Sequence, residues 1–125
     1  MTLSRAALVF LASVAGAAGA QQAADARWSS YRDFWFDYDS AQLDNSDAGK
    51  IADVANYSRQ NPTFRIAIDG ATDPGDPRLG ERRVGAVRDA LIHAGVPAYK
   101  IQTGDFGNQQ LRRERRVEVL VSARY

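Results

Sequence analysis

The stretch of residues 65–91 constrains this chain more than any other, because a strand, a turn and a helix follow one another directly in it. Isoleucines alternate with other residues over 65–70, the pattern of a strand with one buried face that ends at a glycine. Residues 73–75, Asp-Pro-Gly, are typical of a turn. Asp76-Pro77 predicts a helix start, where the carboxylate accepts a backbone N–H and the proline needs none. Asp73 is therefore expected at the carboxyl end of a strand, beside the first turns of a helix.

The helix predicted after Pro77 has one apolar face and one charged face. Its apolar residues recur at helical spacing: Leu79, Val84, Val87, Ala90 and Leu91. Arg82, Arg88 and Asp89 are left facing water. An acid at the strand end and an arginine-rich first helical turn would form a polar notch suited to a zwitterion.

The rest of the chain predicts three more strands and one more helix. We expect a helix over 46–60, a short strand over 101–103 and a last strand over 117–121. Aromatic residues dominate a first strand at 31–38, and those on one side of it should be core: Phe34, Phe36 and Tyr38. The order β-α-β-α-β-β predicts an α+β sandwich with helices on one sheet face.

Residues 1–20 have the features of a secretory signal peptide that is cut before Gln21. One basic residue, Arg5, precedes an apolar run at 6–15 and a small-residue end. The alternative, an uncleaved membrane anchor, is disfavoured because a spanning helix needs about twenty apolar residues. We therefore expect a flexible tail at 21–30, a single domain at 31–125 and a protein secreted to the periplasm.

Composition excludes several functions. There is no cysteine, which excludes disulfides and the lipid-bearing cysteine of a lipoprotein. Without Arg5, basic and acidic residues are equal in number, whereas a nucleic-acid binder usually has a basic excess. The only histidine, His93, stands at a helix end, where it suits the helix dipole better than catalysis. We expect no enzyme, no catalytic residue, no metal and no cofactor.

Four ordered motifs resemble the OmpA/MotB-like periplasmic domain family. Gly-Ala-Thr-Asp at 70–73 is similar to its G-H-T-D, and the segment 79–91 is similar to its L-[SG]-x-x-R-A-x-x-V-x-x-x-L. Phe-Asp-Tyr-Asp-Ser at 36–40 resembles its opening F-D-F-D-S, and Glu-Arg-Arg-Val-Glu-Val at 114–119 resembles its closing N-R-R-V-E-V. The resemblance implies a mixed parallel and antiparallel sheet and a non-catalytic, peptidoglycan-binding role.

The resemblance also implies the ligand residues. In the family, the aspartate and arginine of these motifs hold the ammonium and carboxylate of diaminopimelate, which here assigns Asp73 and Arg83, with Thr72 in the same motif. Arg115 would support the carboxylate, and Asp76 takes the place of the usual asparagine. The bond from the ligand's ammonium to an aspartate and the bond from an arginine to the ligand's carboxylate are both charge-assisted hydrogen bonds, which are strong. The alternatives are that Asp73 and Arg83 only pair with each other, or that Asp73 only shapes its turn.

Other arginines compete with Arg83 for the motif position. Arg88 has the spacing from Asp73 that the family's arginine often shows, but the flanking residues align Arg83, and the two differ by about 140° around a helix. Arg82 is a second competitor, although a solvated helix charge is expected there. For Arg115 and Arg116, the alternative is that one pairs with an acid such as Asp69 while the other is exposed.

The sequence therefore predicts a periplasmic domain that binds the diaminopimelate stem peptide of peptidoglycan. Ala71 replaces the motif histidine, and the loop before the helix is about five residues shorter than is usual in the family. The alternative function is accordingly a degenerate family member that binds outer-membrane or envelope-assembly proteins and not the wall.

Overall fold

The computed structural model describes residues 28–70, 76–104 and 115–122. Its elements follow the predicted order: β1 (Ser29–Trp35), α2 (Asp47–Gln60), β2 (Arg65–Gly70), α3 (Pro77–His93), a 3-10 turn η1 (Ala98–Lys100), β3 (Ile101–Gly104) and β4 (Arg116–Ser122). The α+β class and the β-α-β-α-β-β order are thus confirmed. The predicted signal peptide lies outside the described residues.

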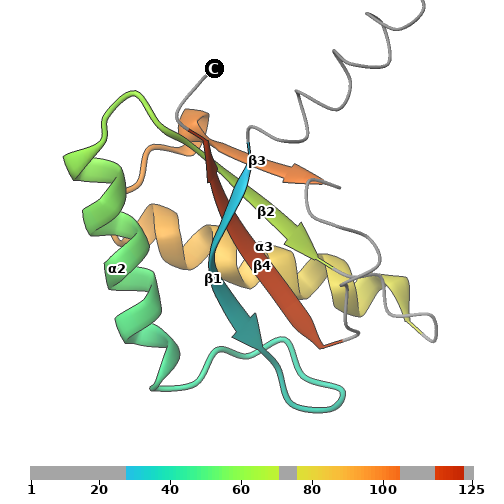
Figure 1. The fold of residues 1–125 in the computed structure, drawn as a ribbon. Helices are drawn as coiled ribbons and strands as arrows, with labels where there is room; N and C mark the ends of the chain where they lie inside the picture. The colour runs from blue at the N-terminus through green and yellow to red at the C-terminus, as the bar shows by residue number, and fades with distance from the viewer. Residues whose placement is uncertain (1–27, 71–75, 105–114, 123–125) are drawn as a thin grey trace, which may run out of the picture.

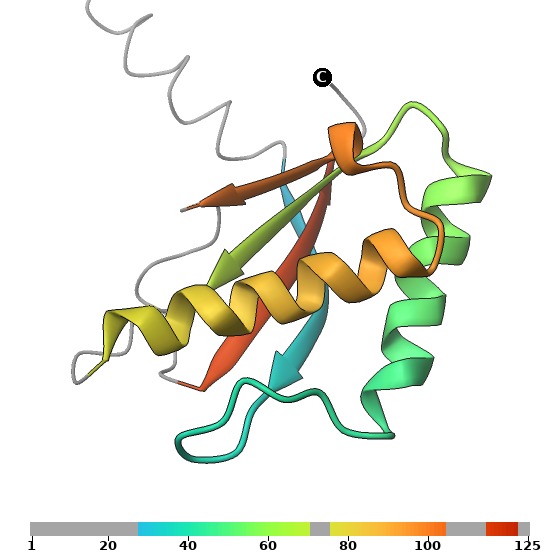
Figure 2. The same cartoon turned by 180° about the vertical axis from the view of Figure 1, so that it is seen from behind.

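The four strands form one mixed sheet in the order β1-β4-β2-β3 (Figure 1). Strand β4 pairs antiparallel with both β1 and β2, whereas β3 runs parallel to β2. A parallel pair needs a crossover connection, and α3 provides it. Figure 2 shows α3 lying across one face of the sheet with α2 beside it, so both helices cover the same face.

The core lies between this sheet face and the two helices. From the sheet it takes Phe34, Ile66, Ile68, Val117 and Val119, and from the helices Ile51, Val54, Val87 and Leu91. Each of these side chains is buried.

None of the helices among the described residues is long and apolar enough to cross a membrane.

The first strand differs from its expected bounds at both ends. It begins at Ser29, within the segment expected as a flexible tail, and it ends at Trp35. Phe34 and Phe36 are buried as predicted, but Tyr38 is 86% exposed, so its assignment to the core was wrong. The reason is a turn after Phe36, in which Asp39 has a left-handed φ of 56°.

Strand β2 also differs from the alternating pattern expected of it. Ala67 and Asp69 are buried together with the two isoleucines, so the prediction of one solvated face was wrong. Ala67 pairs with Leu120 of β4, which is buried as well. The second sheet face is therefore covered near its centre.

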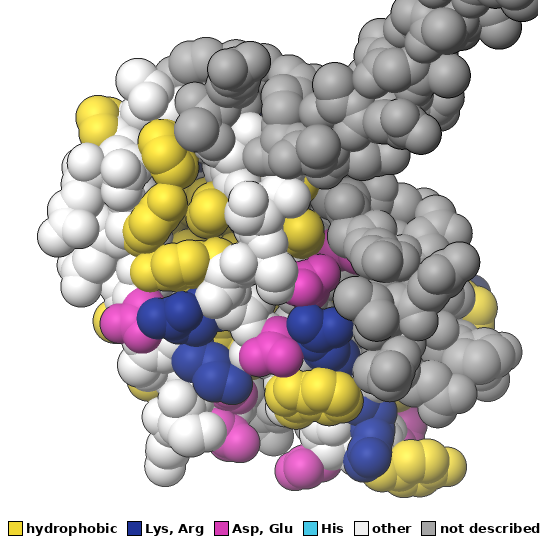
Figure 3. All heavy atoms as spheres, in the orientation of Figure 1, with side chains coloured by type: hydrophobic (Ala, Val, Ile, Leu, Met, Phe, Trp, Pro, Cys, Tyr) yellow, Lys and Arg dark blue, Asp and Glu magenta, His cyan; other side chains and the backbone are white. Residues whose placement is uncertain are grey.

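Charged side chains of both signs mix on the face seen in Figure 3, where Lys and Arg lie next to Asp and Glu. Several described charges are paired: Arg116 contacts Asp33 at 3.1 Å and Glu118 at 3.0 Å, and Arg32 contacts Asp53 at 3.2 Å. This mixing agrees with the balanced charge of the sequence.

Candidate functional site

Described residues of all four sequence motifs meet at one end of the sheet. The backbone N–H of Phe36, just after β1, donates to the carbonyl of Arg115, just before β4, at 2.8 Å. Gly70, the last residue of β2, pairs with Val117 of β4. Gly70 also lies against α3 so closely that a Cβ added to it would overlap Val84 Cγ2. The end of β2 therefore touches the helix one residue away from Arg83.

Arg83 is the central described residue of this region. Its side chain is only 1% exposed, although arginine is rarely fully buried without partners. Nε donates to the carbonyl of Ser40 at 2.8 Å, and Nη2 donates to the carbonyl of Asp37 at 3.1 Å. The guanidinium therefore fastens α3 to the loop that follows β1.

The loop whose carbonyls accept from Arg83 contains the motif at 36–40, and it is folded as a turn. The N–H of Ser40 donates to the carbonyl of Asp37 at 3.2 Å, which closes the turn and directs carbonyls inward. The guanidinium carbon of Arg83 also lies 5.6 Å from the centroid of the Phe36 ring, within the range of a cation–π contact. Sequence reasoning missed this contact between two motifs that are more than forty residues apart.

Asp76 caps α3 as predicted. Its backbone is extended, and its carboxylate accepts from the N–H of Arg78 at 3.1 Å. The same side chain lies 3.8 Å from Arg82, and both are about half exposed. Arg82 is thus a solvated helix charge, which was the interpretation favoured for it. The cap uses part of the hydrogen-bonding capacity of Asp76, which was proposed as a ligand residue.

The other two predicted ligand residues on this side, Thr72 and Asp73, lie outside the described residues. They belong to the connection 71–75 between the end of β2 and the start of α3. Both anchors of this connection, Gly70 and Asp76, are described and lie at the same end of the sheet as Arg83.

The two arginines before β4 have different environments. Arg115 is exposed, and its carbonyl holds the end of β1. Arg116 is partly buried and pairs with Asp33 and Glu118. The sequence predicted such a pairing with an acid, for which Asp69 was the example. The arrangement with one paired and one exposed arginine is the alternative weighed above, and it leaves the Arg115 side chain at the surface.

Arg88 is placed differently from Arg83. Its side chain is 41% exposed and lies 3.7 Å from the carboxylate of Asp89. The difference in burial agrees with the helical-wheel argument that the two arginines cannot share one face. The described residues contain no group of three or more His, Cys, Asp or Glu side chains that could hold a metal ion.

Comparisons with known proteins agree with this architecture. Residues 35–122 match the OmpA family. The peptidoglycan-associated lipoprotein of Brucella melitensis is 31% identical over 81 residues, which cover 61% of this chain and 48% of that protein. The chain thus spans about half the length of that relative.

Two crystal structures are similar in fold. The peptidoglycan-associated lipoprotein from Burkholderia pseudomallei has a TM-score of 0.62 and 25% identity, covering 74% of this chain and 91% of that one. The periplasmic domain of Helicobacter pylori MotB has a TM-score of 0.56 and 17% identity, covering 71% and 69%. At 17% identity, the similarity to the MotB domain is evidence for the fold alone.

Proposed function

The chain belongs to the OmpA family, whose domains are non-catalytic and bind peptidoglycan, and on that premise we propose that it recognises the diaminopimelate of an uncrosslinked stem peptide. The Asp73 carboxylate would accept from the ligand's ammonium group. Arg83 would donate to the ligand's carboxylate, with Arg115 at the surface in support. These are charge-assisted bonds, the stronger class of protein hydrogen bond. We include Thr72 and Asp76 as flanking polar groups.

The observation that carries the proposal is the position of Arg83 at the sheet end where β2 finishes. Asp73 stands three residues after Gly70 and three before Asp76. Since a residue spans at most about 3.6 Å, the Cα of Asp73 lies within about 11 Å of each of these anchors. Gly70 packs against Val84, the neighbour of Arg83. The length of the connection therefore permits the acid and the base to hold one amino-acid head group between them, as the proposal requires.

The fixed orientation of the Arg83 guanidinium would strengthen its interaction with a ligand. The bonds to Ser40 and Asp37 fix the plane of the guanidinium, so less side-chain entropy is lost when a ligand carboxylate arrives. A charged hydrogen bond is also stronger in a less polar surrounding than in water.

The burial of Arg83 favours a second candidate function, an interaction module that does not bind the wall. Arg83 is 1% exposed and already donates to two carbonyls, which is also what a purely structural arginine would do. In that case the OmpA-like fold would serve to bind outer-membrane or envelope-assembly proteins.

A pull-down with purified sacculi separates the two functions. We expect the wild-type protein to sediment with the sacculi and Asp73→Ala to remain in the supernatant. Asp53→Ala is the matched control, because Asp53 is an exposed aspartate on α2. If wild type and Asp73→Ala are found equally in the supernatant, peptidoglycan binding is lost as a function and the interaction module stands.

Ligand identity needs a separate measurement. We expect diaminopimelate to raise the melting temperature of the protein and lysine to leave it unchanged, since only diaminopimelate has a second zwitterionic centre. Asp73→Ala should remove the response. An equal response to both amino acids would contradict diaminopimelate recognition.

We also propose that the protein reaches the periplasm through a signal peptide at residues 1–20. Relatives of similar fold include a periplasmic domain. The mass of the protein recovered from a periplasmic extract tests this, because the mature chain should begin at Gln21. An intact Met1 in that extract would contradict cleavage.

A further inference from the structure

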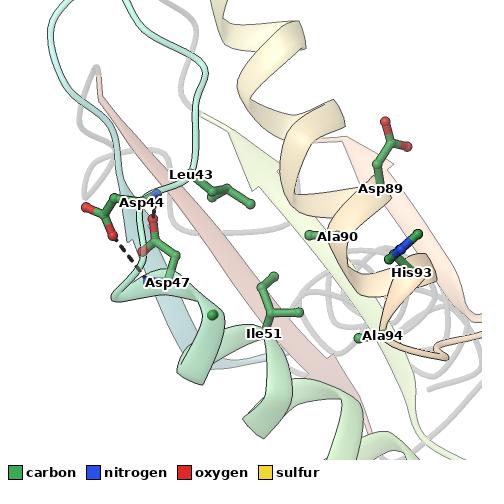
Figure 4. A pocket seen from close by; sticks show the side chains of 9 residues that line it. Leu43, Asp44, Asp47, Ile51, Asp89, Ala90, His93 and Ala94 are labelled. Carbon is green, nitrogen blue, oxygen red and sulfur yellow. Dashed lines mark hydrogen bonds between the residues drawn. The ribbon is translucent and has the colours of Figure 1, made fainter.

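A concave surface lies away from this end of the sheet, between the start of α2 and the end of α3. It has a volume of about 550 Å³. Figure 4 shows Leu43, Ile51, Ala90 and Ala94 around it, contributed by the preceding loop and by both helices. We call this surface the α2–α3 pocket. Its volume is in the range of sites that bind organic ligands or side chains, about 300–1,000 Å³.

Local hydrogen bonds hold the start of α2, which forms one wall of the pocket. The Asp44 carboxylate accepts from the N–H of Ser46 at 3.0 Å and of Asp47 at 3.2 Å, while the Asp47 carboxylate accepts from the N–H of Asp44 at 2.9 Å. This reciprocal pattern has the form of a capping box, set just before the first helical residue, Asp47. The Ser46 hydroxyl also donates to Asp44 at 2.6 Å, and this bond is the main cause that lowers the pKa of Asp44 below that of an ordinary aspartate.

The local sequence explains why the pocket is empty of side chains. A capping box is often accompanied by two apolar residues, one before the box and one after it, which pack together. Here these are Leu43 and Ala48, and alanine is too small to fill the space. The opposite wall also consists of alanines, Ala90 on α3 and Ala94 just after it. A wall of small residues therefore leaves Leu43 and Ile51 facing an open volume.

The rim of the pocket is acidic. Its lining includes the carboxylates of Asp44, Asp47 and Asp89 together with His93, and no lysine or arginine. The Asp89 side chain is 79% exposed. Two neighbouring cations balance part of this charge: Lys50 lies 3.9 Å from Asp47 and donates to the carbonyl of Asp33 at 2.9 Å, and Arg88 lies 3.7 Å from Asp89. Three carboxylates therefore stand against two cations, which leaves an acidic excess at the rim.

From this charge pattern we propose that the α2–α3 pocket is a docking site for a partner protein, which inserts a leucine or phenylalanine next to a lysine or arginine. The apolar side chain fills the volume between Leu43, Ile51 and Ala90. The flanking cation faces Asp44 and Asp89, which gives the pocket its preference for basic segments. An acidic segment is repelled by the same carboxylates.

This site is independent of peptidoglycan binding. Its residues lie at the end of the loop before α2, on the first half of α2 and at the end of α3, whereas the proposed wall ligand would lie at Arg83 in the first half of α3. Both functions can therefore coexist in one molecule, or the pocket can operate alone if wall binding fails.

Three synthetic tetrapeptides test the proposal by NMR titration of the isotope-labelled protein: acetyl-Lys-Phe-Leu-Arg-amide, acetyl-Glu-Phe-Leu-Glu-amide and acetyl-Lys-Ser-Ser-Arg-amide. We expect only the first, which is both apolar and basic, to shift the amide signals of Ala48, Ile51, Ala90 and Ala94 at millimolar concentration. The second peptide keeps the apolar residues but carries acidic ones, so it tests the preference for positive charge. The third keeps the basic residues but lacks the apolar ones, so it tests the need for an apolar side chain.

Two pairs of variants locate the binding. Ala48→Trp should fill the pocket and abolish the shifts, whereas Ala52→Trp, also an exposed alanine of α2, should retain them. Asp89→Lys should weaken binding about fivefold or more, whereas Glu81→Lys, an exposed acid elsewhere on α3, should not. For each variant, unchanged amide signals from residues outside the pocket confirm that the protein is folded.

The proposal is overturned if the basic apolar peptide shifts none of these amides, if the acidic peptide binds as well, or if Ala48→Trp binds like wild type. Occupation by a second copy of this chain would also overturn it. In that case the pocket amides would shift on dilution of the protein without any peptide.

Discussion

The structural role of Arg83 can be tested by Arg83→Met, which keeps the apolar stem and removes the guanidinium. The substitution deletes the bonds to the carbonyls of Ser40 and Asp37. A hydrogen bond to a charged group contributes about 1.5–3 kcal/mol, so the two amount to about 3–6 kcal/mol. Part of this is returned, because the desolvation penalty of a buried charge disappears. We expect a net loss of about 2–4 kcal/mol in the free energy of unfolding.

The control is Arg82→Met, the adjacent residue on the same helix. Arg82 is 56% exposed in its side chain and lies 3.8 Å from Asp76. Exposed pairs of this kind contribute about 0–1 kcal/mol, so this variant should lie within about 0.5 kcal/mol of wild type.

Urea denaturation followed by far-ultraviolet circular dichroism measures both variants. A loss of 2–4 kcal/mol should also lower the melting temperature by more than about 8 °C in a domain of this size. If Arg83→Met is as stable as Arg82→Met, the two carbonyl bonds do not hold the loop after β1, and our account of this end of the sheet is wrong.

Three further predictions follow from other contacts. Gly70→Ala should destabilise the protein by about 1–3 kcal/mol through overlap with Val84, whereas Gly85→Ala, which meets nothing within 4 Å in mid-helix, should stabilise it by up to about 1 kcal/mol; equal effects in chemical denaturation would refute this. The hydroxyl and amide bonds that lower the pKa of Asp44 stabilise the fold above the ordinary aspartate pKa, and this contribution is lost as pH falls through the lowered value. The melting-temperature difference between wild type and Asp44→Asn should therefore shrink in acid, and a constant difference would contradict it. Burial lowers the pKa of Lys100, so the unfolded chain binds its proton more tightly and stability should rise as pH increases through the lowered pKa toward the ordinary lysine value. Lys100→Met should lack this alkaline rise, and an unchanged pH profile would refute the assignment.

Much of the fold could be predicted from local patterns. The bounds of α2 and α3, the cap at Asp76 and the strand ending at Gly70 all appear in the structure near their expected residues. These features depend on interactions between residues a few positions apart, such as helical periodicity, capping and turn chemistry.

Predictions failed where long-range packing decides. Tyr38 continues the alternation of Phe34 and Phe36, yet the chain turns at Asp37–Ser40 and leaves it exposed. The sequence did contain a signal for that turn, since Asp and Ser favour turns. The candidate site shows the same limit. Motif alignment selected Arg83 among neighbouring arginines, but no pattern indicated that its guanidinium bonds the loop after β1.

The sequence by itself determined the class of fold, the order of its elements and the family, because these follow from short-range periodicity and from motifs that can be aligned. The choice of Arg83 as a ligand residue comes from the same motifs and stays a prediction. Only the tertiary structure decided the order of strands in the sheet, the burial of Arg83 and the existence of the α2–α3 pocket. Each of these depends on which surfaces meet across long stretches of chain. Such contacts are set by the combined packing of the sheet and both helices, which no single segment encodes.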